Sequence, residues 1–231
     1  MYFAVVTEAD KQVGRLLAHL DSLGLRDNTI VIFSADNGPE DIGIKNASHS
    51  GVGSPGPFRG RKRSLYEGGT RVPFILSWPA GGTPMGKVDN VTPLSTVDLL
   101  PTFCALAGVS LPDDIQLDGE AMDDVFKGAA RQRTKPLMWE WRFHVFGYCI
   151  NRSPILAIRR ENWKLLLNPE RDRIELYDIP NDPMELNNVA DFHPDIVDRL
   201  SEEVLRWQTT LPEGPLDPDA GSNAYPWPGT F

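Results

Sequence analysis

The stretch from Thr29 to Pro39 constrains the fold of this chain more than any other part of the sequence. Residues 30–35 are almost entirely apolar, and the branched side chains and the phenylalanine among them favour an extended backbone. A run this short and this apolar is typical of a strand that is buried on both faces, as in a parallel sheet. Asp36 and Asn37 follow directly, and open α/β sheets place their ligand sites at the carboxyl ends of such strands. We therefore expect an α/β sheet with a polar site at its edge.

Asp36 and Asn37 supply oxygen donors of the kind that Ca²⁺ and Mg²⁺ prefer. A simple turn is the alternative interpretation, because the Asn-Gly and Gly-Pro pairs in residues 37–39 are common turn formers. This stretch on its own does not decide between a metal site and a turn.

Three adjacent bases, Arg61, Lys62 and Arg63, come shortly before a Tyr-Glu-Gly-Gly turn at residues 66–69. They follow a polar loop, rich in Gly and Pro, that runs to about residue 60, and loops of this length are often functional. One interpretation is a solvated charged loop. The other is an anion site, in which a lysine and its flanking arginines lie beside a metal-bound anionic group.

Hydrophobic periodicity predicts the remaining elements. Apolar residues recur at spacings of three and four in residues 2–23, which indicates an amphipathic helix that ends at Gly24. Short apolar runs after residue 134 are separated by turn residues and indicate a small antiparallel sheet. The predicted helices are 2–23, 92–107 and 194–211, and the predicted strands are 30–35, 74–79, 137–141, 155–159, 163–167 and 173–177.

The change of pattern near residue 128 predicts two domains. Residues 1–128 form the α/β part, and residues 129–231 form an α+β subdomain with the antiparallel sheet, a closing helix and an extended tail. The fold class is therefore α/β followed by a small antiparallel subdomain.

Composition excludes several classes of function. The net charge of −9 argues against a nucleic-acid partner, which would need a basic face. No apolar run reaches the roughly 18 residues of a membrane span, and no signal peptide is visible. The two cysteines, Cys104 and Cys149, make neither a disulfide framework nor a metal site, and each is interpreted as a small buried hydrophobe.

Several stretches, in this order, resemble the C-terminal half of the type I sulfatases, a family with an alkaline-phosphatase-like fold. Residues 31–38 resemble the family's second metal-ligand motif. Residues 62–73 resemble its Lys-x-x-x-(Tyr/Phe)-Glu-Gly-Gly-x-Arg-x-Pro segment. The other matching stretches are 95–102, 117–119, 158–165 and 175–188, and residues 139–142 and 212–228 look closest to N-acetylgalactosamine-6-sulfatase-like members.

The resemblance implies hydrolysis of sulfate esters with Ca²⁺, on a sulfated carbohydrate such as a glycosaminoglycan or on an aryl sulfate. Asp36 and Asn37 would be two of four protein metal ligands outside the nucleophile. Lys62 would be the catalytic residue that contacts the sulfate and leaving-group oxygens, where a cation neutralises developing charge. The predicted substrate contacts are His49, Arg61, Arg63 and His144, of which His49 matches no catalytic histidine of the family.

The family's nucleophile has no match in this sequence. It is a formylglycine made from the Cys or Ser of a Cys-x-Pro-x-Arg motif, and neither Cys104 nor Cys149 lies in such a motif. The paired Asp ligands and the Lys-x-His motif of the family are also unmatched. We expect these groups upstream of Met1, so that this chain holds half of the calcium site, pairs with a missing N-terminal half, and is inactive alone. The resemblance also implies a periplasmic, extracellular or lysosomal location.

Two other functions remain open from the sequence. The first is a non-catalytic remnant of the fold that binds calcium or glycans. The second is another alkaline-phosphatase-like enzyme, such as a phosphodiesterase or phosphomutase, although Lys62 and the Tyr-Glu-Gly-Gly turn go with sulfatases. An upstream reading frame with Cys-x-Pro-x-Arg would favour the enzyme over the remnant.

Overall fold

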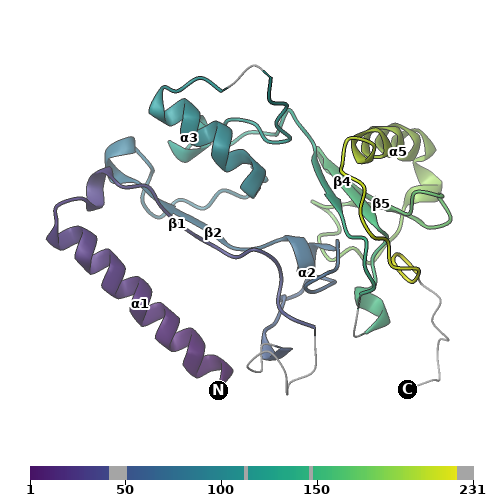
Figure 1. The fold of residues 1–231 in the computed structure, drawn as a ribbon, viewed down its shortest axis with the longest axis horizontal. Coiled ribbons are helices and arrows are strands. Elements are labelled where there is room, and N and C mark those ends of the chain that lie inside the picture. The colour runs from purple at the N-terminus through teal and green to yellow at the C-terminus, as the bar shows by residue number, and fades with distance from the viewer. Residues whose placement is uncertain (42–50, 112–113, 146–147, 223–231) are drawn as a thin grey trace. The chain divides into compact units, whose positions relative to one another are not determined.

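The computed structural model describes residues 1–41, 51–111, 114–145 and 148–222, and the chain forms two compact units (Figure 1). Unit 1 comprises Met1–Ala35 and Pro73–Leu137, and unit 2 comprises Asp36–Val72 and Met138–Phe231. This division differs from the predicted domains 1–128 and 129–231. Residues 36–72 belong to the same unit as the C-terminal sheet.

Unit 1 begins with helix α1 (Tyr2–Ser22), which confirms the predicted helix. Strand β1 (Val31–Ser34) pairs with β2 (Phe74–Ser77) in an antiparallel, two-stranded sheet. The prediction of a strand buried on both faces in a parallel sheet is therefore wrong for the described residues. Phe33 lies opposite Ile75, and these residues are 53% and 60% exposed, so the described residues leave much of both side chains uncovered.

Within the predicted helical region 92–107, the helix itself begins at Leu99. A short 3₁₀ turn, η4 (Thr96–Asp98), precedes helix α3 (Leu99–Ala107), and Ser95 and Asp98 form a capping box at the turn. Gly108 ends α3 with a positive φ of 66°, as its position predicts. The short elements η1 (Arg26–Asn28), η3 (Pro79–Gly81) and α4 (Asp123–Phe126) complete unit 1.

Unit 2 contains a four-stranded sheet in the order β3-β4-β5-β6, in which β5 pairs antiparallel with both β4 and β6. Its strands match the predicted ones to within one residue at each end. They are β3 (Leu137–Glu140), β4 (Leu156–Arg160), β5 (Trp163–Leu167) and β6 (Ile174–Asp178). The remaining elements are α2 (Glu67–Thr70), η5 (Cys149–Asn151), η6 (Ala190–Phe192) and the closing helix α5 (Pro194–Gln208).

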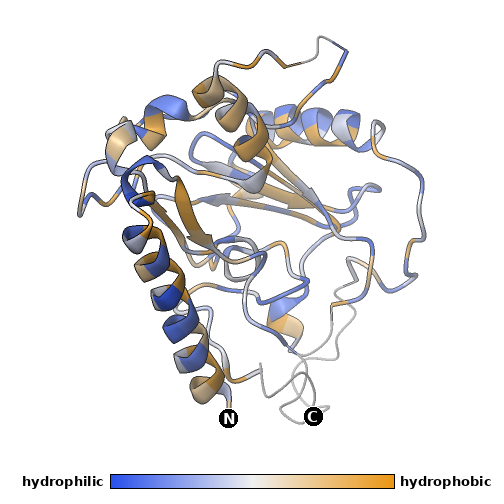
Figure 2. Cartoon of the chain, turned by 60° about the vertical axis from the view of Figure 1, so that its left-hand side comes forward, coloured by the Kyte–Doolittle hydropathy of each residue, from blue (hydrophilic) through white to orange (hydrophobic). Residues whose placement is uncertain are grey.

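The two faces of this sheet are buried by different partners. Side chains alternate between the faces of a strand, so Leu165 and Leu167 point to one side of β5, and Lys164 and Leu166 to the other. The first side packs under α5, whose apolar side is visible in Figure 2. The buried residues of this layer are Ile155, Leu156, Ile158, Leu165, Leu167, Leu176, Val197, Leu200 and Val204.

The second side of the sheet packs against the segment around Tyr66. Leu65 and Tyr66 share a buried cluster with Leu166 and Tyr177, and Trp139 packs against it. This contact explains why residues 36–72 belong to unit 2. It also brings the predicted lysine loop onto the C-terminal sheet.

Candidate functional site

Asp36 and Asn37 lie just beyond the end of β1, as the sequence predicts. The Asp36 carboxylate is exposed and accepts a hydrogen bond from the Asn37 backbone N–H at 3.0 Å. The side-chain nitrogen of Asn37 donates to the Gly38 carbonyl at 2.9 Å. Because the nitrogen of this amide is engaged, its oxygen is the atom that can serve a cation.

Gly38 joins this segment to the glycine turn at residues 68–69. Its N–H donates to the Gly69 carbonyl at 2.8 Å. A Cβ atom at position 38 would lie 1.9 Å from the Gly68 carbonyl oxygen, so the two backbones can approach this closely only because residue 38 is glycine.

Lys62 lies beside the same segment. Its backbone N–H donates to the Pro39 carbonyl at 2.9 Å, and its Nζ lies 3.7 Å from Glu40 Oε2. The Lys62 side chain is 38% exposed. The structure therefore brings the predicted catalytic lysine next to the predicted metal-binding segment, although the two motifs are about 25 residues apart in the sequence.

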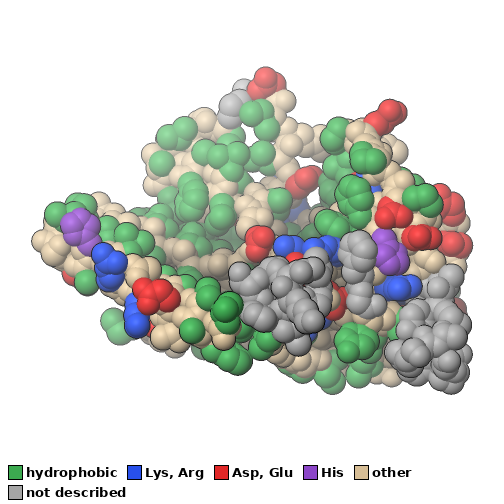
Figure 3. All heavy atoms as spheres, turned by 60° about the horizontal axis from the view of Figure 1, so that its bottom comes forward, with side chains coloured by type: hydrophobic (Ala, Val, Ile, Leu, Met, Phe, Trp, Pro, Cys, Tyr) green, Lys and Arg blue, Asp and Glu red, His purple; other side chains and the backbone are tan. Residues whose placement is uncertain are grey.

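Arg61 and Arg63, predicted to contact substrate, have partners within this loop. The Arg61 guanidinium donates to the Glu40 carbonyl at 2.9 Å and lies 3.7 Å from Asp41 Oδ1. Arg63 pairs with the Glu40 carboxylate. Figure 3 shows basic and acidic side chains side by side on one face of the molecule. The contacts of Arg61 and Arg63 with Glu40 and Asp41 indicate that these arginines order the loop, and a role in binding substrate stays a prediction.

The donor set fits a hard cation in type but not in number. A carboxylate and an amide oxygen suit Ca²⁺, which takes six to eight oxygen ligands. Among the described residues, no group of three or more His, Cys, Asp or Glu side chains is placed to hold a metal. Asp36 and Asn37 can therefore supply part of a calcium site, and further ligands must come from other groups.

The segment that carries Lys62 is fixed to the sheet through Tyr66. Its hydroxyl donates to Glu175 Oε2 at 2.6 Å, and the Tyr177 hydroxyl donates to the same oxygen at 2.7 Å. The Arg59 guanidinium stacks on the Tyr66 ring, 3.8 Å from its centroid. Burial, followed by the nearby Glu175 carboxylate, raises the pKa of both tyrosines, so both remain hydrogen-bond donors.

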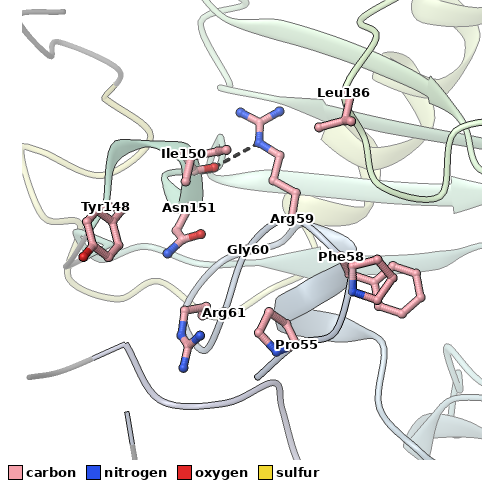
Figure 4. Close-up of a pocket in the computed structure, with 10 residues that line it drawn as sticks. Pro55, Phe58, Arg59, Gly60, Arg61, Tyr148, Ile150, Asn151 and Leu186 are labelled. Atoms are coloured by element: carbon pink, nitrogen blue, oxygen red, sulfur yellow. Dashed lines mark hydrogen bonds between the residues drawn. The ribbon is translucent and has the colours of Figure 1, made fainter. Parts of the chain in front are cut away.

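A cavity of about 290 Å³ opens beside this segment (Figure 4). Apolar side chains line much of it, including the exposed ring of Tyr148, and Arg61 and Asn151 supply polar groups. Asn151 Nδ2 donates to Asp41 Oδ2 at 3.2 Å, which ties one wall of the cavity to the loop. The lining residues are Pro55, Pro57, Phe58, Arg59, Gly60, Arg61, Tyr148, Ile150, Asn151 and Leu186.

The predicted histidine contacts are only partly visible. His49 lies outside the described residues. His144 is half-buried in unit 2, and its backbone N–H donates to Asp217 Oδ2 at 3.1 Å. Cys104 and Cys149 are free thiols, and both are half-buried.

Three buried charged residues near the site received no role from the sequence. Lys164 and Glu175 lie on strands β5 and β6, and Glu185 follows β6. A charged side chain inside an otherwise apolar strand was the available signal, since such a residue is rarely buried without a partner. The sequence could not identify the partners, because they lie about 100 residues upstream.

Comparison with known proteins supports a single family. The family model for sulfatases matches residues 1–109. A second model, for the C-terminal part of N-sulphoglucosamine sulphohydrolase, matches residues 58–210. Together they span the α/β elements, the lysine loop and the C-terminal sheet.

Curated relatives point the same way. The chain is 33% identical to N-acetylgalactosamine-6-O-sulfatase of Bacteroides thetaiotaomicron over 86% of its own length and 40% of the relative. It is 30% identical to human steryl-sulfatase over 93% of its length and 41% of the relative. The chain thus spans about two fifths of the length of these relatives.

Solved structures share the fold. A protein of Bacteroides thetaiotaomicron, solved in work on the metabolism of multiple glycosaminoglycans, has a TM-score of 0.69 at 30% identity and covers 87% of this chain and 43% of its own. A second, in complex with its substrate D-glucosamine-2-N,6-O-disulfate, has a TM-score of 0.66 at 25% identity, over 90% of this chain and 40% of its own. These neighbours confirm the predicted α/β fold class. No helix in the described part of the chain is long and apolar enough to cross a membrane.

Proposed function

Because this chain belongs to the type I sulfatase family, we propose that it is the part of a sulfatase that supplies Lys62 and half of a calcium site. The proposed reaction is the hydrolysis of a sulfate ester on a sulfated carbohydrate. The observation that carries the proposal is the backbone contact between the two motifs. Lys62 N–H bonds to the Pro39 carbonyl, two residues beyond Asn37.

Asp36 and Asn37 would hold the metal through a carboxylate and an amide oxygen. Bound there, Ca²⁺ supplies positive charge that stabilises the negative charge on a transferring sulfuryl group. The remaining ligands are proposed to come from a segment outside this chain, since Ca²⁺ takes more oxygens than these two residues offer.

Lys62 is proposed to bind the sulfate and the leaving-group oxygen. Its ammonium carries three donors on a flexible stem, so it can follow the oxygen as charge develops. Glu40, 3.7 Å from Nζ, orients this side chain along the loop without burying it. The partial exposure of Lys62 leaves its charge accessible to a substrate.

The nucleophile is proposed to come from the missing N-terminal half. Neither cysteine of this chain lies in a Cys-x-Pro-x-Arg motif. The exposed apolar pair Phe33 and Ile75 on the β1–β2 sheet supports this proposal, because such a face is normally covered by further structure. By the same family relation, the assembled protein is proposed to act in the periplasm, outside the cell or in a lysosome.

The cavity next to Arg61 supports a carbohydrate substrate. Sites for small molecules combine an apolar or aromatic wall with a few polar groups, as Tyr148, Arg61 and Asn151 do here. An aryl sulfate would also fit an apolar wall, so the reconstitution experiment measures hydrolysis of both classes of sulfate ester.

A second candidate function is a non-catalytic remnant that binds calcium or glycans. The observation in its favour is the incomplete donor set, since the described residues hold no cluster of three metal-ligating side chains. The two functions differ in a simple way. Only the enzyme gains hydrolytic activity when a nucleophile-bearing segment is supplied.

The test is reconstitution. The chain is co-expressed with the N-terminal segment of N-acetylgalactosamine-6-O-sulfatase from Bacteroides thetaiotaomicron, and hydrolysis of N-acetylgalactosamine 6-sulfate and of an aryl sulfate is measured. We expect no turnover by the chain alone, turnover by the pair, and a loss of at least about 100-fold with Lys62→Ala, as for removal of one transition-state donor. Lys127→Ala, at an exposed lysine of unit 1, is the matched control. Turnover by the chain alone, or an unaffected Lys62→Ala pair, would contradict the proposal.

A further inference from the structure

A buried ionic cluster lies on the face of the sheet that the lysine segment covers. Lys164 is fully buried on β5, and its Nζ lies 2.9 Å from Glu67 Oε1 and 3.0 Å from Glu185 Oε1. Glu67 and Glu185 are also buried, at 2% and 0% exposure. These residues come from three places in the chain, 97 residues apart for Glu67 and Lys164.

Glu185 contacts the backbone at Glu67 as well as the Lys164 side chain. Its Oε2 accepts the Glu67 N–H at 2.5 Å. This N–H is one of the first in the short helix α2, where no helical partner exists. Glu185 itself adopts a positive φ of 56°, a backbone conformation that non-glycine residues rarely take. Strain of this kind persists only where the surrounding structure fixes the residue.

Three arginines from neighbouring segments also contact the cluster. Arg159 on β4 and Arg71 at the end of α2 lie 3.6 and 3.5 Å from Glu67 Oε2. Arg59 donates to the Glu185 carbonyl at 3.1 Å. Removing one partner from such a buried set leaves another charge uncompensated, so its geometry is strongly determined.

A short path of hydrogen bonds leads from this cluster to the candidate metal segment. Gly68 and Gly69 follow Glu67 in the chain. The Gly68 N–H donates to the Arg59 carbonyl, and the Gly69 carbonyl accepts the Gly38 N–H. Gly38 adjoins Asn37. The cluster therefore fixes the glycine turn that accepts the Gly38 N–H.

We propose that Glu185 and Lys164 are positioning residues that set the place of the Asp36–Pro39 segment through Glu67 and the glycine turn. Neither residue touches a metal or a substrate in this arrangement. The inference rests on the proposed function for its biological meaning. Its physical content, a link from position 185 to position 38, does not depend on activity.

The test is amide hydrogen exchange, measured by NMR on the full 231-residue chain. In Glu185→Ala we expect the protection of the Gly38 amide to fall by about tenfold or more, the effect of losing one buried hydrogen bond. The amides of Leu165 and Ile158, which pair in the middle of the sheet, should keep their protection. Glu185→Gln retains an acceptor for the Glu67 N–H and should restore most of the protection at Gly38. Glu202→Ala, at an exposed glutamate on α5, is the matched control.

Two outcomes would overturn the inference. One is a Gly38 amide that is unaffected by Glu185→Ala, and the other is a uniform fall in protection that includes Leu165 and Ile158. If Glu185→Ala does not fold, the wild-type chain provides the test. Its hydrogen bond to Glu185 should make the Glu67 amide exchange as slowly as the amides in the core of the sheet. A fast Glu67 amide would contradict the link. Reconstituted sulfatase activity tests the proposed function separately, so failure of one is distinguishable from failure of the other.

Discussion

Gly38 is the residue at which the two halves of the candidate site meet. A methyl group there would overlap the Gly68 carbonyl oxygen, so Gly38→Ala must push the two segments apart. We expect it to reduce the free energy of unfolding by about 1–3 kcal/mol, the usual cost of overpacking. Chemical denaturation measures this change.

Gly14→Ala provides the control for this substitution. Gly14 lies in α1 with open space around its Cα, and alanine there should raise stability by roughly 0.5–1 kcal/mol through helix propensity. Equal effects at the two positions would show that the approach of residue 38 to residue 68 is not tight.

Glu185 gives the site a dependence on pH. Burial raises its pKa to about 7 from 4.5, with Glu67 acting in the same direction and Lys164 against it, because two buried carboxylates share one ammonium. A raised folded-state pKa means that the protonated carboxyl favours folding. The contribution of Glu185 to folding stability is therefore complete below about pH 4.5 and is lost as the pH rises through about 7.

We expect the stability of the wild-type chain to fall between pH 5 and pH 8, relative to Glu185→Gln, by up to roughly 3 kcal/mol. Burial acts to raise the pKa of Glu67 too, but Lys164 and Arg159 outweigh it and lower that pKa. The Glu67 contribution is therefore lost only as the pH falls below 4.5, outside this pH range. Denaturant titrations at several pH values measure the difference. A wild-type curve parallel to that of Glu185→Gln would contradict the assignment.

At the scale of elements, periodicity located nearly every helix and strand. Short apolar runs between turn residues predicted β4, β5 and β6, whose two faces are both buried, and the apolar stripe of α5 predicted the closing helix. The capping box at Ser95 and Asp98 sets the start of α3 inside the predicted region 92–107.

The error at β1 has a different cause. An apolar strand indicates burial on both faces, but the described residues provide only β2 as a neighbour. Likewise, motifs proposed Asp36, Asn37 and Lys62 as site residues, whereas they gave no role to the buried residues Lys164, Glu175 and Glu185. A motif identifies a residue from its neighbours in the sequence. A buried ion pair depends on a partner far away in the chain, which the local sequence does not reveal.

At the scale of the whole molecule, the proposed calcium site leads to an expectation about metal binding. The chain supplies one carboxylate and one amide oxygen at residues 36 and 37, with Lys62 close by in the loop. Ca²⁺ affinity rises with the charge and number of its ligands, and a neighbouring ammonium opposes a cation. Weak binding is therefore expected until further ligands are supplied.

Calorimetric titration of Ca²⁺, with and without the N-terminal segment, tests the central claim most directly. The account predicts weak or undetectable binding by the chain alone, tighter binding by the assembled pair, and loss of that binding in the pair with Asp36→Ala. Asp10→Ala, an exposed acid on α1, should leave it unchanged. Sub-micromolar binding by the chain alone that Asp36→Ala removes would show that the site is complete without the other segment, and would contradict the account.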